Sequence, residues 1–270
     1  MKHLKLYFLV FIAVSFGISA IIYNYYAPPR MRQPYLIPRH HNDTIRVAYI
    51  GDSWAAVHKN YDSRMERMIE VRLYRPVKVL SYGICGLTSK EIYNHLFDDP
   101  KLKTFIQQGF DFCIISAGIN DTYKKMSTTY YKKSMNGIIQ FLLTNKIYPI
   151  ILEIPDYDIQ KAFDRQTLTR KKIRQVSMTI TRTPIDCKEM FRHELLELIT
   201  EKGYKDIVSI LHYKSWNGYY TNHQKHLYLN DGMHLNANGY KQLDDAIARL
   251  LEGKILMHSD DSLNDSSFSN

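Results

Sequence analysis

The sequence predicts an α/β domain with a central parallel sheet covered by helices on both faces, preceded by a separate apolar helix. Apolar runs of strand length alternate with segments whose apolar residues recur at helical spacing, and that alternation is typical of a parallel sheet. The 270-residue chain is 45% apolar and 23% charged, which is an ordinary globular composition. Collagenous, low-complexity and wholly disordered chains are therefore excluded.

The first predicted element is a signal anchor or a signal peptide over residues 1–27. Two lysines precede an uncharged run from Leu6 to Ile22, and tyrosines follow it, where an aromatic belt would sit at a membrane surface. Ala20 offers a poor cleavage site, because the bulky Ile18 lies two residues before it. We therefore expect an uncleaved membrane anchor.

The position of the following domain is less tightly constrained by charge, because basic residues lie on both sides of the apolar run. A short basic N-terminus usually stays inside the cell. We expect the domain on the extracytoplasmic side, in the cell envelope, or secreted if the segment is cleaved.

The rest of the chain divides into a linker, one domain and a tail. Residues 28–42, rich in Pro, Arg and His, are expected to form a linker, and the domain covers residues 43–257. The tail, residues 258–270, is mostly Ser, Asp and Asn and is expected to be disordered because it cannot bury enough apolar surface. The three cysteines, Cys85, Cys113 and Cys187, are widely spaced and predict neither a disulfide framework nor a metal site.

Five apolar runs within the domain are the expected strands. They are Ile45–Ile50, Val77–Tyr82, Phe112–Ala117, Tyr148–Ile154 and Ile207–Tyr213. Helical spacing of apolar residues follows in the segments 131–142, 191–199 and 240–250. The stretch 155–230 is longer than one connection, one helix and one strand require, and such an insertion is where specificity is commonly built.

Polar and glycine residues follow the strands at the points where the strands end. The first strand runs into Gly51-Asp52-Ser53-Trp54, the second into residues 81–89, and the third into Gly118-Ile119-Asn120-Asp121. A fourth segment, Asp231-Gly232-Met233-His234, precedes the last helix. Because the carboxyl ends of parallel strands line the ligand crevice of an open α/β sheet, we expect these segments to meet at one edge.

These residue types predict acyl-transfer chemistry. A serine on a tight turn is a weak nucleophile until a base takes its proton, and a histidine held by a carboxylate is the usual base. Asp231 and His234 are three residues apart, so on a helical turn they would share a face with the ring turned toward Ser53. The backbone N–H groups of Ser53 and Gly86 and the amide of Asn120 would hold the negative oxygen of a tetrahedral intermediate.

The four segments resemble the sequence blocks of the SGNH hydrolases, also called GDSL esterases and lipases, from Gly51 to the last helix. The resemblance implies a flavodoxin-like three-layer sandwich with a mostly five-stranded parallel sheet. It also implies that Ser53 is the nucleophile, that Asp231 and His234 supply acid and base, and that Gly86 and Asn120 complete the oxyanion hole.

Three features of the blocks leave questions open. Trp54 stands where the GDSL name has leucine, which concerns the wall of the pocket more than the chemistry. Ser81 stands near where many members have asparagine. Gly83 is an alternative to Gly86 as the oxyanion donor.

The predicted function is hydrolysis of an O-acyl ester, with an O-acetyl group on a carbohydrate as the expected substrate. An O-acyltransferase, a lipase and a thioesterase are alternatives on the same site, and an inactive glycan-binding or scaffold protein is an alternative of a different class. The mechanism needs no cofactor and no metal. The formal charge of +9 suits an anionic partner, but the sequence has no RNA-reading motif or phosphate loop, so nucleic acid is not expected.

Other polar and aromatic groups allow a functional and a structural interpretation each. Histidines 212, 223 and 226 could bind a metal or lie in loops, and His40-His41 fits a solvated linker. The aromatic segment Trp216–Tyr220 could stack on a sugar or pack in the core. A basic run could hold an anionic substrate or a membrane surface, or be a solvated face; it comprises Arg165, Arg170, Lys171, Lys172, Arg174 and Arg182.

Overall fold

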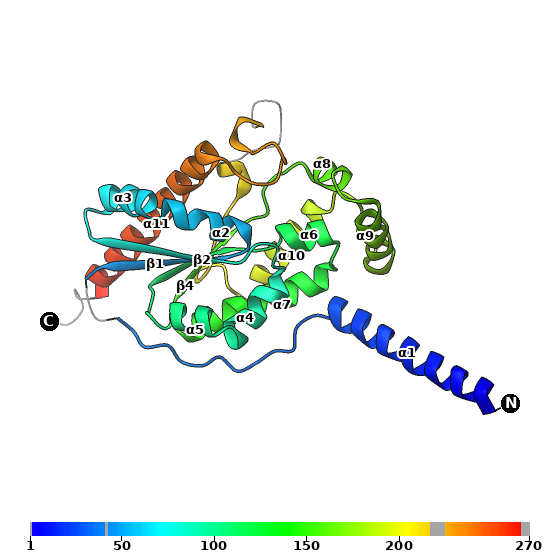
Figure 1. Cartoon of the computed structure of the whole chain (residues 1–270). Coiled ribbons are helices and arrows are strands. Elements are labelled where there is room, and N and C mark those ends of the chain that lie inside the picture. Colours follow the sequence, from blue (N-terminus) through cyan, green and yellow to red (C-terminus); the bar gives the residue numbers. More distant parts are fainter. Residues whose placement is uncertain (1, 41–42, 217–224, 266–270) are drawn as a thin grey trace.

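A five-stranded parallel sheet forms the centre of the molecule (Figure 1). The computed structural model describes residues 2–40, 43–216 and 225–265. The strand order is β2-β1-β3-β4-β5, with all four pairs parallel. The strands are β1 (Ile45–Gly51), β2 (Val77–Gly83), β3 (Phe112–Ser116), β4 (Tyr148–Leu152) and β5 (Ser209–Leu211). Each predicted strand is present, and the last three are shorter than predicted.

Helices cover both faces of the sheet, so the three-layer α/β class predicted from the sequence is confirmed (Figure 1). One face carries α2 (Ser53–His58), α3 (Asp62–Leu73) and α11 (Ala237–Asp265). The other carries α4 (Ser89–Asp98), α5 (Pro100–Ile106), α7 (Thr128–Thr144) and α10 (Lys188–Glu201). Short 3-10 helices are found at Lys59–Tyr61, Tyr213–Ser215 and Lys225–Leu227.

Local sequence signals set where several helices begin. Thr88 caps α4, because its hydroxyl accepts a hydrogen bond from the backbone of Glu91 while the Glu91 carboxylate accepts one from the backbone of Thr88. Pro100 occupies the first position of α5 after Asp99, where a missing N–H costs nothing. These caps fix the ends of the connections that follow β2.

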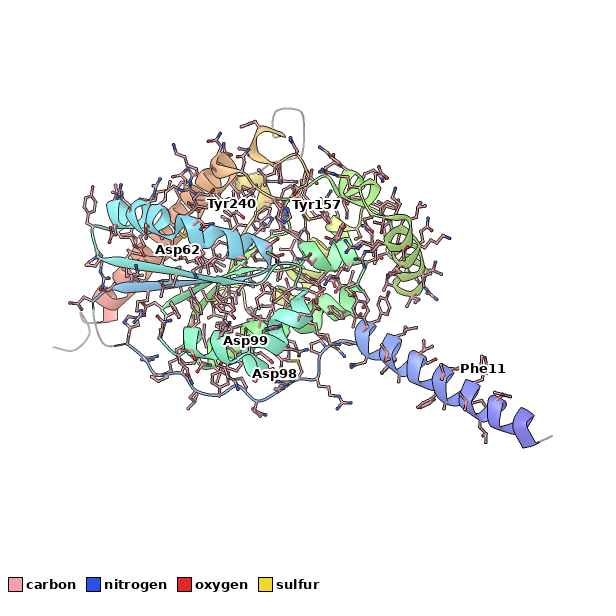
Figure 2. All side chains as sticks on the ribbon, in the orientation of Figure 1. Phe11, Asp62, Asp98, Asp99, Tyr157 and Tyr240 are labelled. Carbon is pink, nitrogen blue, oxygen red and sulfur yellow. The ribbon has the colours of Figure 1, made fainter. Side chains whose placement is uncertain are left out.

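Within the long stretch 155–230, the segment 155–182 forms a helical insertion at the carboxyl edge of the sheet. It contributes α8 (Ile159–Asp164) and α9 (Leu168–Thr181), which lie near α6 (Ile119–Lys124) in Figure 1. Tyr157, labelled in Figure 2, anchors the insertion: it is fully buried, and its hydroxyl lies 2.8 Å from that of Thr122 on α6. The insertion is therefore attached to the domain beside the strand ends.

The N-terminal helix α1 (Lys2–Tyr26) projects from the domain (Figure 1). Its segment Leu9–Tyr26 has a mean hydropathy of 1.7, none of it is buried, and Phe11 in Figure 2 lies far from the domain. By length and composition this helix is apolar enough to cross a membrane.

Residues 28–40, which we call the strap, run along the domain instead of forming a free linker. The Arg32 backbone N–H donates to the Tyr93 hydroxyl at 2.7 Å, and the Ile37 N–H donates to the Asn145 side chain at 2.7 Å. The Tyr35 ring packs edge-on against Phe141, with the centroids 5.0 Å apart. The strap is docked because its apolar side chains pack on the domain. Its content of Pro, Arg and His does not by itself predict these contacts.

Two further expectations for the chain ends differ from the structure. His40 is not a solvated linker residue, because its ring lies 2.9 Å from the Asp111 carboxylate and is largely buried; His41 lies outside the described residues. The expected disordered tail begins at residue 258, yet α11 continues to Asp265. An existing helix is extended without a new nucleation cost, so polar residues can continue it.

Candidate active site

Ser53 is positioned by the junction of β1 and α2. It is the first residue of α2, directly after Asp52, whose side chain caps the helix by accepting a hydrogen bond from the Trp54 N–H at 3.0 Å. The sheet order places β1 between β2 and β3, which is the point where the order reverses. A ligand crevice is expected at such a point, because the connections leave to opposite faces.

His234 lies against Ser53, and Asp231 lies against His234. The Ser53 Oγ and the His234 Nε2 are 3.0 Å apart, and the His234 Nδ1 is 2.6 Å from the Asp231 Oδ2. Both distances are within hydrogen-bonding range. The three side chains, which we call the Ser53 cluster, thus form a continuous chain of hydrogen bonds.

The turn that presents His234 is an aspartate-capped bend and not the helical turn suggested by the spacing. The Asp231 Oδ1 accepts the backbone N–H groups of Met233 at 2.9 Å and His234 at 3.0 Å. Burial acts to raise the pKa of Asp231, but these bonds and the imidazole outweigh it and leave the pKa below its usual value. Asp231 is therefore held as a carboxylate that orients the ring.

Asn120 and Gly86 lie at the same pocket as Ser53, and Gly83 does not. Gly83 is packed against α2, where an added Cβ would meet the Ala56 nitrogen at 2.2 Å. Gly86 has a left-handed φ of +83° and open space around it, and it lines the pocket. The geometry thus separates a packing glycine from one whose backbone faces the site.

Two buried aspartates hold Asn120 and helix α6 in place. The sequence alone indicated no role for either aspartate. The Asp52 Oδ2 accepts a hydrogen bond from the Asn120 Nδ2 at 3.2 Å, and its Oδ1 accepts the Ser116 hydroxyl at 3.0 Å. Asp121 accepts the N–H and the hydroxyl of Ser89, at 2.8 and 2.6 Å, and so ties α6 to the start of α4. The helix-capping position of Asp52, between a strand and the serine, is the signal that could have revealed its role.

Burial dominates the electrostatics of both aspartates. It raises the pKa of Asp52 to about 6 and that of Asp121 to about 7, against the hydrogen bonds that favour the charged forms. Both side chains are fully buried. They support the site from behind and do not line the pocket itself.

A pocket of about 450 Å³ opens over the Ser53 cluster. Besides the cluster, Gly86 and Asn120, its walls include Tyr123 from α6 and Arg165 at the end of α8. One Arg165 nitrogen donates to the Asn230 carbonyl at 2.9 Å, which holds the guanidinium beside the turn that carries Asp231 and His234. The pocket therefore brings together the Ser53 hydroxyl and its histidine, the Asn120 amide, the backbone of Gly86 and the cation of Arg165.

The basic run of the sequence separates into different environments. Arg165 lines the pocket, whereas Arg174 donates to the Lys124 carbonyl at 3.3 Å and lies over the Tyr123 ring. The other four cations, Arg170, Lys171, Lys172 and Arg182, lie on or directly after α9. The pattern of charge in the sequence does not by itself predict which of these cations lies at the pocket.

The aromatic and histidine candidates occupy structural positions where the chain is described. Trp216 is buried and packs against Trp54 at 5.9 Å, so neither is a sugar-stacking face or a pocket wall; residues 217–220 lie outside the described residues. His212 lies 3.4 Å from the Glu153 carboxylate, and His223 is not described. Within residues 2–40, 43–216 and 225–265, no three His, Cys, Asp or Glu side chains gather as metal ligands.

Comparison with solved structures identifies the fold. A lipase/acylhydrolase from Enterococcus faecalis superposes with a TM-score of 0.53 at 18% identity, over 78% of this chain and 96% of that one. A GDSL-like lipase from Bacteroides thetaiotaomicron gives 0.50 at 15% identity, over 77% and 88% of the chains. A candidate SGNH hydrolase from Slackia heliotrinireducens gives 0.50 at 14% identity, over 76% and 98%.

This chain has the SGNH-hydrolase fold. The expectation from the four sequence segments is thereby confirmed at the level of the fold. No protein-family model matches the sequence, and no curated protein matches it. At these identities the likeness extends to the fold alone, so the activity must be argued from the site.

Proposed function

We propose that this protein is a serine ester hydrolase whose nucleophile is Ser53. The observation that carries the proposal is the chain of hydrogen bonds from the Ser53 Oγ through the His234 ring to the Asp231 carboxylate, at 3.0 and 2.6 Å, beneath an open pocket. This arrangement is that of a nucleophile, a general base and the group that orients the base.

The proposed reaction is acyl transfer through a covalent intermediate. His234 takes the proton of the Ser53 hydroxyl, and the Ser53 Oγ attacks the ester carbonyl. The N–H groups of Ser53 and Gly86 and the Asn120 amide bind the negative oxygen that forms. His234 returns its proton to the leaving alcohol, and a water activated by the same ring then releases the acyl group and frees Ser53.

The proposed substrate is an O-acyl ester, in the first instance an O-acetyl group carried by a sugar. A pocket of about 450 Å³ that contains the cation of Arg165 favours an ester whose carbohydrate part bears a negative charge. We also propose that α1 holds the domain at the outer face of a membrane in the cell envelope, which would bring it to envelope glycans.

An O-acyltransferase is the alternative that differs least, because a sugar hydroxyl would replace water in the second half of the reaction. A lipase or thioesterase would differ in its acyl group, and its rate would rise with acyl chain length. An inactive glycan-binding protein would use the same pocket without any need for the Ser53 hydroxyl.

The test compares full-length protein in detergent with its Ser53→Ala variant. We expect wild type to release acetate from p-nitrophenyl acetate and from an acetylated acidic polysaccharide, and we expect Ser53→Ala to lose both activities. Ser134→Ala is the matched control, because this buried serine on α7 donates only to the Tyr130 carbonyl, remote from the pocket. Full turnover by Ser53→Ala would overturn the proposal, as would glycan binding without turnover by a folded wild type.

A further inference from the structure

Helix α9 presents an apolar stripe to solvent. Ile173, Val176 and Ile180 follow one another at intervals of three and four residues, and they are 52%, 58% and 51% exposed. This spacing places them on one face of the helix. Ser177, the single buried residue of α9, lies four residues after Ile173 and borders this face. The half-buried residues 171, 174, 178 and 181 lie on the side turned toward the domain. The helix therefore turns its apolar face away from the domain that carries it.

Cations flank this stripe. Arg170, Lys171, Lys172 and Arg182 lie on α9 or directly after it, and the segment 168–182 contains no acidic residue. Within the described parts of the chain, none of these four cations forms an ion pair. A helix with an exposed apolar face and unpaired cations is the pattern of a helix that lies in a membrane interface.

The position of α9 relative to α1 supplies an independent observation. The Tyr26 hydroxyl, in the last turn of α1, hydrogen bonds to the Ser177 hydroxyl on α9. From α4, the Lys90 ammonium donates to the carbonyls of Asn24 and Ala27, at 2.7 and 2.8 Å, which fixes the same end of α1 to the domain. Figure 1 shows α9 beside the point where α1 leaves the domain.

This attachment sets the height of α9 above a bilayer. The apolar segment Leu9–Tyr26 ends at the residue that contacts Ser177, so a membrane crossed by that segment would have its surface at the level of α9. Tyrosines 23, 25 and 26 lie at this end, and aromatic residues favour the boundary between headgroups and water.

We propose that α9 docks on anionic lipid headgroups beside the membrane entry of α1. The stripe of Ile173, Val176 and Ile180 enters the boundary with the acyl chains, and the flanking cations bind lipid phosphates. The inference rests on α1 crossing a membrane and does not depend on the proposed enzymatic activity. A second copy of the chain is a poorer occupant, because pairing two α9 faces would bring unpaired cations of like sign together.

Docking of α9 would also fix the place of the pocket. Arg165 ends α8, lines the pocket and lies three residues before the start of α9. The pocket would then be held near the lipid headgroups, because Arg165 in its wall is attached to α9 by a short connection.

The experiment uses full-length protein reconstituted in vesicles of phosphatidylcholine and phosphatidylglycerol, with a tryptophan placed on α9. Val176→Trp is compared with Val71→Trp, since Val71 is also an exposed helical valine, 66% accessible, but lies on α3. We expect brominated phospholipids to quench roughly half of the added fluorescence of Val176→Trp, at an insertion depth of roughly 5–10 Å. We expect Val71→Trp to respond as the wild type, whose two tryptophans are buried.

A charge variant then tests the role of the headgroups. Lys172→Glu combined with Arg182→Glu should abolish the quenching of Val176→Trp, whereas Lys101→Glu combined with Lys205→Glu, which changes exposed lysines elsewhere, should leave it intact. Equal responses of Val176→Trp and Val71→Trp would overturn the proposal, and so would a chain that alkaline carbonate strips from the vesicles. Two other results would also overturn it. One is quenching of Val176→Trp that does not depend on phosphatidylglycerol. The other is a fluorescence change of Val176→Trp that appears without brominated lipid and only at high protein concentration.

Discussion

A second cluster of serine, histidine and aspartate lies between β2, α2, α3 and α11, and it differs from the Ser53 cluster in access and in charge. It consists of Ser81, His58, Asp62 and Asp244, and we call it the Ser81 cluster. The His58 ring and the Asp244 carboxylate are fully buried, whereas the Ser53 cluster lines an open pocket. The same residue types therefore form two clusters, and of the two it is the Ser53 cluster that lies beside a pocket with room for a substrate.

The charge around each histidine differs as well. The His58 Nε2 lies 2.8 Å from Asp244, and its Nδ1 lies 3.1 Å from Asp62, so a carboxylate faces each ring nitrogen. Burial acts to lower the pKa of His58, but the two carboxylates outweigh it and raise the pKa above its usual value. His234 faces one carboxylate and keeps its second nitrogen for Ser53.

The hydroxyl groups of the two serines also differ in their hydrogen-bond partners. The Ser81 hydroxyl donates to the Asp62 carboxylate, and an imidazolium at His58 could not accept its proton. The Ser53 hydroxyl has the His234 ring as its partner. A ring nitrogen that no carboxylate occupies and an open pocket, more than the presence of three residue types, therefore separate a candidate active site from a structural network.

The largest expected difference is in turnover after loss of each histidine. His234→Ala should lower kcat/KM for p-nitrophenyl acetate by roughly 10³–10⁴-fold, because it removes the general base. His58→Gln should keep kcat/KM within a few-fold of wild type, because His58 does not reach the pocket. A folded His58→Gln protein that lost as much activity as His234→Ala would reverse the assignment of the two clusters.

The next effect concerns the proposed oxyanion hole beside Ser53. Asn120→Ala should lower kcat by roughly 10²–10³-fold with a much smaller change in KM, because the amide acts on charge that develops in the transition state. Asn94→Ala on α4 is the matched control and should leave both constants near wild type. An Asn120→Ala effect confined to KM would instead place the amide in substrate binding.

Loss of stability should be larger for the Ser81 cluster than for the Ser53 cluster, which is the reverse of the order expected for turnover. His58→Ala should lower the free energy of unfolding by about 3 kcal/mol, because it removes one partner of a buried ionic network. His234→Ala should cost less than about 1 kcal/mol, because that side chain is partly exposed. Thermal unfolding in detergent measures both, and equal losses would contradict the distinction drawn between the sites.

The smallest effect is on the pH dependence of stability. Because the folded pKa of His58 is raised, its stabilising contribution is complete below the unfolded pKa of about 6.5 and is lost as pH rises through the higher folded value. Stability of the wild type should therefore decline as the pH rises above about 6.5, and His58→Gln should decline less. Asp52 and Asp121 are present in both proteins, so their contributions cancel in the comparison. An unchanged slope would mean that His58 is not charged in the folded state.

The sequence predicted the sheet because its strands are local patterns. It predicted the Ser53 cluster, although Ser53 and His234 are 181 positions apart, because their segments follow strand ends and resemble the sequence blocks of a known family. The buried strands are continuous apolar runs, and Asp231 and His234 belong to one turn. The Ser81 cluster depends on packing between residues far apart in the chain: His58 and Asp244 are separated by 186 positions, and no spacing rule relates them. The docking of Tyr35 on Phe141 has the same origin.

The remaining differences arise where one residue type serves several purposes. Trp54 and Trp216 suggested a pocket wall and a sugar platform, but they pack on each other, and a large aromatic side chain gains more from burial than from exposure. The basic run contained one pocket residue, Arg165, one cation that lies over the Tyr123 ring, Arg174, and four further cations at α9. The fold of the insertion places Arg165 at the pocket and the other cations elsewhere. The periodicity of the sequence did not predict that fold.

The most direct test of the account is to map the site of covalent labelling by a fluorophosphonate probe. Full-length protein in detergent is labelled while folded, digested, and analysed by mass spectrometry, beside His234→Ala and His58→Gln. We predict one adduct, on Ser53, that disappears in His234→Ala and persists in His58→Gln. A folded wild type without an adduct on Ser53, or with its adduct on Ser81 or another serine, would contradict the central claim that the Ser53 cluster is a catalytic site.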